Sequence, residues 1–281
     1  MHLIMTDGIE HVAFYFSPHE DDWQLFMNPP AFTDVLDAAC RAVFVHMTAG
    51  DAGLGLGNGG RKHPFYLARE HGAEAAIRFM ADADERSPIE AQTGAVSCNG
   101  QSLQRTAYRN TATYFLRLPD GSPSGDGYET TGRQSLKRLR GGDIDGMTTI
   151  DGAAVYRDWE ALCETLRALI EYERQGELAV DLHIPETDAA LNPNDHSDHV
   201  TTALAVREAW RGQPARWHHH VGYASGSRPD NLGSAERDMK CAVYAVTLAG
   251  VLAFDHSVSW RHYDQMFIGR NYSRVEHLER S

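Results

Sequence analysis

The stretch HVAFYFS at residues 11–17 decides the fold, because it is a short apolar and aromatic run that ends at Pro18. A run of this length, bounded by a turn residue, predicts a buried strand. Residues 41–47 (RAVFVHM) have the same character and stop shortly before Gly50, and the residues between the two runs, 32–40, have helical spacing. The start of the chain therefore predicts strand, helix, strand.

The same alternation continues along the rest of the chain. Further strands are predicted at residues 111–118, 177–183 and near 220–224, and helices at 64–83, 159–174, 199–210 and 234–254. Alternating strands and helices predict a layered α/β domain with a mainly parallel sheet flanked by helices. Ligands of such domains gather beyond the carboxyl ends of the strands.

The chain shows no internal repeat and no linker, so we expect residues 1–281 to form one domain. Two Gly-rich stretches, near 50–60 and 119–146, are long for simple connections and are predicted to be loop insertions. Loops of this length are more often binding loops or lids than plain connections.

The composition excludes several classes of protein. The net charge of −13 argues against duplex DNA or an anionic membrane as the main partner, because both are recognised by basic residues. The four cysteines are far apart and form no CxxC pair, so they fit neither a zinc ribbon nor a disulfide scaffold. We interpret them as small buried hydrophobic residues in a reducing compartment.

The chain also lacks the patterns of targeting and membrane segments. Its start has no basic region and reaches Asp7 before any long apolar run, which does not fit a signal peptide. The longest apolar stretch, residues 242–254, is too short to span a bilayer. We therefore expect a cytoplasmic protein with no membrane insertion and no nucleic-acid partner.

A first cluster of chemical groups follows directly after the first predicted strand. Glu20, Asp21 and Asp22 stand in a row next to His19, and three adjacent carboxylates repel one another unless a cation lies among them. In a helical turn starting near His19, this histidine and Asp22 face the same side, and Asp21 projects differently. The arrangement suits a divalent metal site, and the alternative is a polar loop or a helix cap at Asp21 or Asp22.

A second cluster, NPNDHSDH, occupies residues 192–199 between a predicted strand and a predicted helix. It could simply cap that helix through Ser197 or Asp198. However, His196 and His199 flank an aspartate, imidazole is the commonest zinc ligand, and bound histidines usually donate their other N–H to a carboxylate. The two clusters together contain the groups of a catalytic zinc site with an open position.

These segments resemble a known family. The PHEDD motif at 18–22, the TAGDAG loop at 48–53, the FLRLPDG turn at 115–121 and HSDHV at 196–200 are similar to segments of the PIG-L/LmbE family of zinc-dependent N-acetylglucosaminyl deacetylases. The resemblance covers about residues 10–255. It implies a Rossmann-like α/β fold, one bound divalent ion, Zn²⁺, and an N-acetylated amino sugar as substrate.

The resemblance also implies roles for single residues. The family's first motif, His-Pro-Asp-Asp-Glu, makes His19 and Asp22 zinc ligands and Asp21 the general base. Its later motif, His-Pro-Asp-His, makes His199 the third ligand. In that motif His196, in its protonated form, stabilises the oxyanion or donates a proton, and Asp198 is the acid between the two histidines. The catalytic set is then Asp21, His196 and Asp198.

The chain departs from the family pattern at four positions. Glu20 and Ser197 stand where the family has prolines, and Trp23 stands where it has glutamate. Gly72 replaces a glutamate that the family often has three residues after its arginine, which leaves the implied substrate-binding role of Arg69 open. The predicted ligands and the predicted base are unaltered.

The expected activity is zinc-dependent hydrolysis of the acetamide of an N-acetylglucosaminyl group. The long Gly-rich loops and the excess of arginine (23) over lysine (3), typical of a GC-rich genome, favour antibiotic biosynthesis, with a glycosylated natural product such as a glycopeptide as substrate. A deacetylase or amidase acting on a glucosaminyl-inositol thiol precursor or conjugate remains an alternative. A non-catalytic sugar-binding protein is a third, against which the intact Asp21 argues.

Three other motifs do not predict a second site. The GxGxxG pattern at residues 55–60 is separated from the preceding strand by residues 49–54, unlike a dinucleotide-binding turn. The three histidines at 218–220 cannot all reach one ion if they lie in a strand, because adjacent side chains alternate between faces. The basic stretch at 133–140 (RQSLKRLR) is interpreted as a solvated loop.

Overall fold

The computed structural model describes residues 8–84, 89–176, 178–260 and 263–278. Its centre is an eight-stranded sheet with the order β10-β9-β8-β1-β2-β5-β4-β3. The strands are β1 (His11–Ser17), β2 (Cys40–Thr48), β3 (Gln92–Cys98), β4 (Gln101–Tyr108), β5 (Thr111–Leu118), β8 (Ala179–Pro185), β9 (Ala215–His220) and β10 (Ser273–Leu278). The five from β9 to β5 run parallel, and β10, β4 and β3 are antiparallel additions at the two edges.

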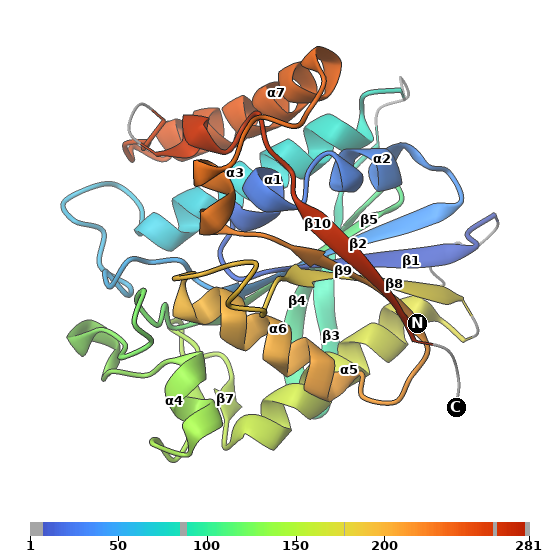
Figure 1. Cartoon of the computed structure of the whole chain (residues 1–281). Helices are drawn as coiled ribbons and strands as arrows, with labels where there is room; N and C mark the ends of the chain where they lie inside the picture. The colour runs from blue at the N-terminus through green and yellow to red at the C-terminus, as the bar shows by residue number, and fades with distance from the viewer. Residues whose placement is uncertain (1–7, 85–88, 177, 261–262, 279–281) are drawn as a thin grey trace.

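Helices cover both faces of this sheet (Figure 1). On one face lie α1 (Asp22–Phe26), α2 (Pro30–Leu36), α3 (Phe65–Ala81) and α7 (Ser234–Ala253), and on the other α4 (Leu136–Gly141), α5 (Trp159–Arg174) and α6 (Ser197–Ala209). A small second sheet joins β6 (Met147–Thr148) to β7 (Val155–Tyr156), and the single-turn helices are η1 (Glu129–Thr131), η2 (Tyr223–Ser227) and η3 (Asp264–Met266). The predicted Rossmann-like α/β fold with a mainly parallel sheet is confirmed.

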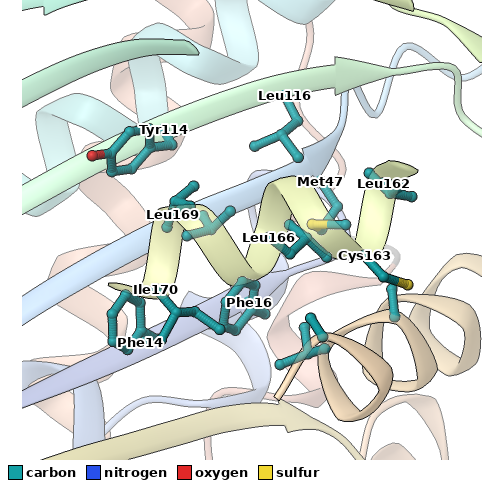
Figure 2. Packing of buried hydrophobic residues seen from close by; sticks show 14 of the residues in the cluster. Phe14, Phe16, Met47, Tyr114, Leu116, Leu162, Cys163, Leu166, Leu169 and Ile170 are labelled. Atoms are coloured by element: carbon teal, nitrogen blue, oxygen red, sulfur yellow. The ribbon is translucent and has the colours of Figure 1, made fainter. Parts of the chain in front are cut away.

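The central strand β1 is apolar throughout because both of its faces are buried. Phe14 and Phe16 point to the α5 side, where they pack with Leu166 and Ile170 (Figure 2). Tyr15, on the other face, belongs to the core beneath α2 and α3. Burial on both faces explains why this strand is a continuous apolar run rather than an alternating one.

The order of the strands creates a crevice beyond β1. From β1 the chain moves outward through β2 to β5, and then returns to the opposite side of β1 to form β8. The carboxyl ends of β1 and β8 therefore lie at the point where the strand order reverses. In open α/β sheets this switch point is where ligands bind.

Most predicted elements are present, with limited differences. The strand expected near 220–224 is wrong, because β9 ends at His220 and η2 follows it. Residues 133–140 are only partly loop, since Ser135 caps α4 by accepting the backbone N–H of Arg138. The helix expected over 32–40 spans Pro30–Leu36 instead. Within the described part of the chain, no helix is both long enough and apolar enough to cross a membrane.

Candidate metal centre

The loops that follow β1 and β8 bring the two predicted clusters together at the switch point. His19 and Asp22 come from the turn after β1 and the start of α1, and His196, Asp198 and His199 come from the start of α6. All five side chains belong to buried residues. Segments nearly 180 residues apart in sequence therefore form one compact group of imidazoles and carboxylates.

Two imidazole nitrogens of this group lie close to one carboxylate oxygen. Asp22 Oδ2 lies 2.9 Å from His19 Nδ1 and 3.2 Å from His199 Nε2. Asp22 Oδ2 also accepts the backbone N–H of His19 at 2.8 Å, which fixes the carboxylate in the turn. Ligand atoms bound tetrahedrally to zinc at about 2.0–2.1 Å lie about 3.3 Å from one another. The two spacings from Asp22 Oδ2 are close to that value.

The remaining nitrogens of both histidines face carboxylates. His19 Nε2 lies 3.4 Å from Asp198 Oδ2, and His199 Nδ1 lies 3.0 Å from Asp195 Oδ2. Carboxylates in this position fix the ring orientation and tautomer of metal-binding histidines. The arrangement leaves His19 Nδ1 and His199 Nε2 directed at Asp22.

Buried atoms without partners show that the group suits a bound cation. Among the described residues, His199 Nε2 and Asp198 Oδ1 are buried and make no hydrogen bond. Donor atoms of His19, His196 and His199 also lie within 4.8 Å of one another, as do those of His19, Asp120, His196 and Asp198. Nitrogen and oxygen donors in these sets are ligands for zinc and similar divalent ions.

The charges of the group depend on one another. Burial raises the pKa of Asp22, but His199 and His19 outweigh that effect and hold it well below the usual value. Conversely, burial lowers the pKa of each of these histidines, and the nearby carboxylates, Asp22 foremost, raise it well above the usual value. Positive charge is thus stabilised at this position by the carboxylates around it.

His196 is oriented by the helix that it begins. It is the N-cap of α6, in place of the predicted Ser197 or Asp198, and its Nδ1 accepts the backbone N–H of Asp198 at 3.1 Å. The ring proton must then lie on Nε2. Burial, together with the neighbouring His19, lowers the pKa of His196 to about 4. The hydrogen bond to Nδ1 favours a neutral imidazole with an N–H donor at Nε2 over the expected protonated form.

Asp21 lies beside the cluster and pairs with Arg69. The guanidinium donates to Asp21 Oδ1, lies with Nε 3.1 Å from Glu20 Oε2, and donates to the Gly50 carbonyl at 2.6 Å. Arg69 is therefore occupied by three groups of the protein itself. Asp21 remains partly exposed, and among the described residues its Oδ2 has no hydrogen-bond partner.

A cavity of about 290 Å³ opens next to this pair. Arg69 and Asp21 form its polar wall, and the facing side comes from α7 and residues 257–259. Its apolar lining residues are Phe65, Tyr244, Leu248, Val251 and Val258.

Two further groups support the site and were not predicted from the sequence. Asp195 was given no role, although its spacing of four residues from His199 places both on one side of a helical turn. The backbone N–H of Gly121 donates to Asp198 Oδ2 at 2.9 Å. No local signal marks this second contact, because it joins the turn after β5 to the start of α6.

No protein-family model matches the chain, and no curated protein sequence matches it. Among solved structures it is similar to N,N'-diacetylchitobiose deacetylase from Pyrococcus horikoshii, determined in complex with its inhibitor MPG. The TM-score is 0.50 with 13% sequence identity, and the similarity covers 94% of this chain and 83% of the other. At this identity the comparison supports the fold.

Proposed function

We propose that this protein is a metal-dependent N-deacetylase of the PIG-L/LmbE type. It would hydrolyse the acetamide of an N-acetylglucosaminyl group and release acetate and a free amine. The observation that carries the proposal is the convergence of Asp22 Oδ2 with His19 Nδ1 and His199 Nε2 at the switch point of the sheet. The fold that it shares with a chitobiose deacetylase supports the same reaction class.

His19, Asp22 and His199 would hold the metal ion. We prefer this set to one containing His196. His196 Nδ1 accepts a backbone N–H where it caps α6, so the ring proton lies on Nε2 and neither nitrogen has a lone pair to offer a metal ion. Asp198 and Asp195 would then act as positioning residues that orient the two ligand histidines. When bound, a zinc ion supplies a Lewis acid that lowers the pKa of water and polarises an acetyl carbonyl.

Asp21 would be the general base. It is adjacent in sequence to the ligand Asp22 but lies outside the ligand set, and its Oδ2 is available to accept a proton from water. Arg69 donates to the other oxygen, Oδ1, which fixes the orientation of the carboxylate and leaves Oδ2 available. We therefore propose that Arg69 acts first as a positioning residue for Asp21, while also lining the cavity where substrate would lie.

His196 would stabilise the oxyanion as a neutral donor. Its Nε2–H can donate a hydrogen bond to the oxygen on which negative charge develops in the transition state. Because the imidazole is neutral, the proton for the departing amine would come from Asp21, which has just accepted one from water.

The cavity beside Asp21 bears on the substrate. Its lining combines charged and hydroxyl groups with apolar residues that come mainly from α7, so an apolar group next to the sugar would have a surface on which to pack. This supports an N-acetylglucosaminyl group on a glycosylated natural product as the substrate.

Metal analysis and acetate release, measured together, test the proposal. Asp21→Asn should retain the ion at this centre and lose turnover, whereas His19→Ala and His199→Ala should lose both the ion held at this centre and turnover. His277→Gln, at an exposed histidine on β10, serves as a control that should keep both. Full metal occupancy in His199→Ala would show that the ligand assignment is wrong, and full turnover in Asp21→Asn would exclude Asp21 as the base.

A further inference from the structure

A second group of metal-ligand side chains lies at the opposite end of the sheet. His11 begins β1 and Cys40 begins β2, and the register of these parallel strands pairs the two residues. Asp34, on α2, completes the group. One donor atom from each residue lies within 4.8 Å of the others. His11 is six residues before Ser17, so about 20 Å of strand separates this group from the switch point.

The fold places all three side chains on one face. Cys40 lies on the same face of β2 as Ala42 and Phe44, which pack in the core beneath α2 and α3. His11 occupies the equivalent position on β1, two residues before Ala13 of the same core. Asp34 reaches this face from the helix above it. The group therefore links α2 to both central strands.

The surrounding contacts resemble those around bound ions. Tyr15 Oη donates to Asp34 Oδ2 at 2.5 Å, and His183 Nε2 lies 3.6 Å from the same oxygen. Among the described residues, Asp34 Oδ1 and the His11 imidazole have no hydrogen-bond partner. One carboxylate oxygen is thus held in place while the other, and a ring nitrogen, are available to an ion.

A cavity that His11 lines and two acidic groups, Asp34 and Cys40, lie at this position. A cavity of about 550 Å³, lined by His11, Asp181 and Arg216 among others, lies at this end of the sheet. Burial, and to a lesser extent the nearby Asp34, raises the pKa of the Cys40 thiol. Burial also raises the pKa of Asp34. A divalent cation would stabilise both anions, as it does in metal-bound thiolates.

We propose that His11, Asp34 and Cys40 bind a second divalent ion of the zinc class, independent of the centre at the switch point. Thiolate, imidazole and carboxylate are the three ligand types that zinc takes in proteins. Three protein ligands leave a fourth position for water from the adjacent cavity. The ion would fasten α2 to β1 and β2.

Cobalt titration of the metal-free protein tests this proposal without reference to activity. A thiolate bound to Co²⁺ gives a near-ultraviolet charge-transfer band that imidazole and carboxylate ligands do not give. The wild-type chain should show this band, and His199→Ala should keep it, because the first centre has no cysteine. Absence of the band from the wild-type chain would overturn the proposal.

Two variants and one control complete the test. Cys40→Ser should lose the band, whereas Cys163→Ser, which alters a buried cysteine on α5 on the other side of the sheet, should keep it. Asp34→Asn keeps the thiol and should weaken Co²⁺ binding at this site by at least about 10-fold. A band that survives Cys40→Ser, or an unchanged affinity in Asp34→Asn, would contradict the assignment.

Discussion

Both oxygens of the Asp195 carboxylate face one nitrogen of His199, at 3.1 and 3.0 Å from Nδ1. The carboxylate is itself held by the Asn192 side-chain amide at 2.7 Å and by the backbone N–H of Tyr223 at 3.2 Å. Burial raises the pKa of Asp195, but His199 outweighs that effect and keeps the pKa below its usual value. The charged carboxylate thus fixes the ring with Nε2 directed toward Asp22.

Replacing this carboxylate should weaken metal binding. Asp195→Asn keeps the shape but removes the charge, and loss of such an outer partner typically lowers metal affinity by about 10–100-fold. The dissociation constant can be measured by competition with a chromophoric chelator. Glu208→Gln, which alters a surface ion pair on the same helix, is the control. Equal affinities in the two variants would contradict the role given to Asp195.

A glycine in the loop after β2 should be required for activity. A Cβ at Gly50 would lie 2.5 Å from Glu20 Oε2 and 2.8 Å from Arg69 Cζ, so Gly50→Ala should displace Arg69 and with it Asp21. Misplacement of a catalytic group by about 1 Å can lower kcat on the order of 10²-fold. Metal content should be unchanged.

Gly59→Ala is the matched control for this substitution. Gly59 lies in the same Gly-rich loop and also has a positive φ, +57° against +47° for Gly50, but an added Cβ there meets no atom within 4 Å. Both variants therefore carry similar backbone strain. Only Gly50→Ala should lose turnover, and a similar loss in Gly59→Ala would attribute the effect to the loop backbone rather than to Arg69.

Glu173 on α5 should be important for stability. It is fully buried, pairs with Arg105 and Arg41, and accepts a hydrogen bond from Tyr114 Oη at 2.5 Å. Glu173→Gln leaves buried positive charge without its counter-ion, which costs about 3–5 kcal/mol. The free energy of unfolding can be measured in denaturant. Glu171→Gln, on the exposed side of the same helix, should change it by less than about 1 kcal/mol.

A buried histidine pair should make the protein sensitive to acid. His183 Nδ1 lies 3.0 Å from His220 Nε2, and burial lowers the pKa of His220 to about 3 and that of His183 well below its usual value. An unfolded chain binds these protons near pH 6.5. Between about pH 3 and 6.5 the unfolded state therefore holds more protons, and stability falls as the pH falls.

His220→Gln tests this dependence. The amide can retain the contact with His183 but does not titrate, so the slope of unfolding free energy against pH should decrease by up to about 1.4 kcal/mol per pH unit. Denaturant unfolding at several pH values between about 4 and 6 measures that slope. His277→Gln, at an exposed position, should leave the slope unchanged. An unchanged slope in His220→Gln would mean that its imidazole titrates normally in the folded protein.

Local features of the fold could be predicted from the sequence. The strand at residues 11–17 was predicted with the bounds it has, because an apolar run ending at a proline contains its own start and stop signals. The turn that places His19 beside Asp22 is likewise local. The hairpin β3–β4 was not predicted, because most of β3 is exposed and the strand contains no long apolar run. The strand β9 was misplaced because its buried residues include His219 and His220.

Contacts between distant segments could not be predicted in this way. The approach of His199 to Asp22 depends on β8 pairing with β1, and no residue in either segment specifies that pairing by itself. The family resemblance supplied the grouping of His19, Asp22 and His199, but not the neutral state of His196, which follows from its bond to a backbone N–H. The pairing of Asp21 with Arg69 could not be predicted either, since it joins the turn after β1 to the second turn of α3.

The most direct test of the account is acetate release from N-acetylglucosaminides by the protein before chelation, after chelation and after reloading with zinc. We predict release by the metal-loaded protein, loss of release when the ion is removed, and recovery on adding about one equivalent per active centre. Release that continues unchanged after complete removal of metal would contradict a metal centre formed by His19, Asp22 and His199. No release from any N-acetylglucosaminide by the fully loaded protein would contradict the deacetylase assignment itself.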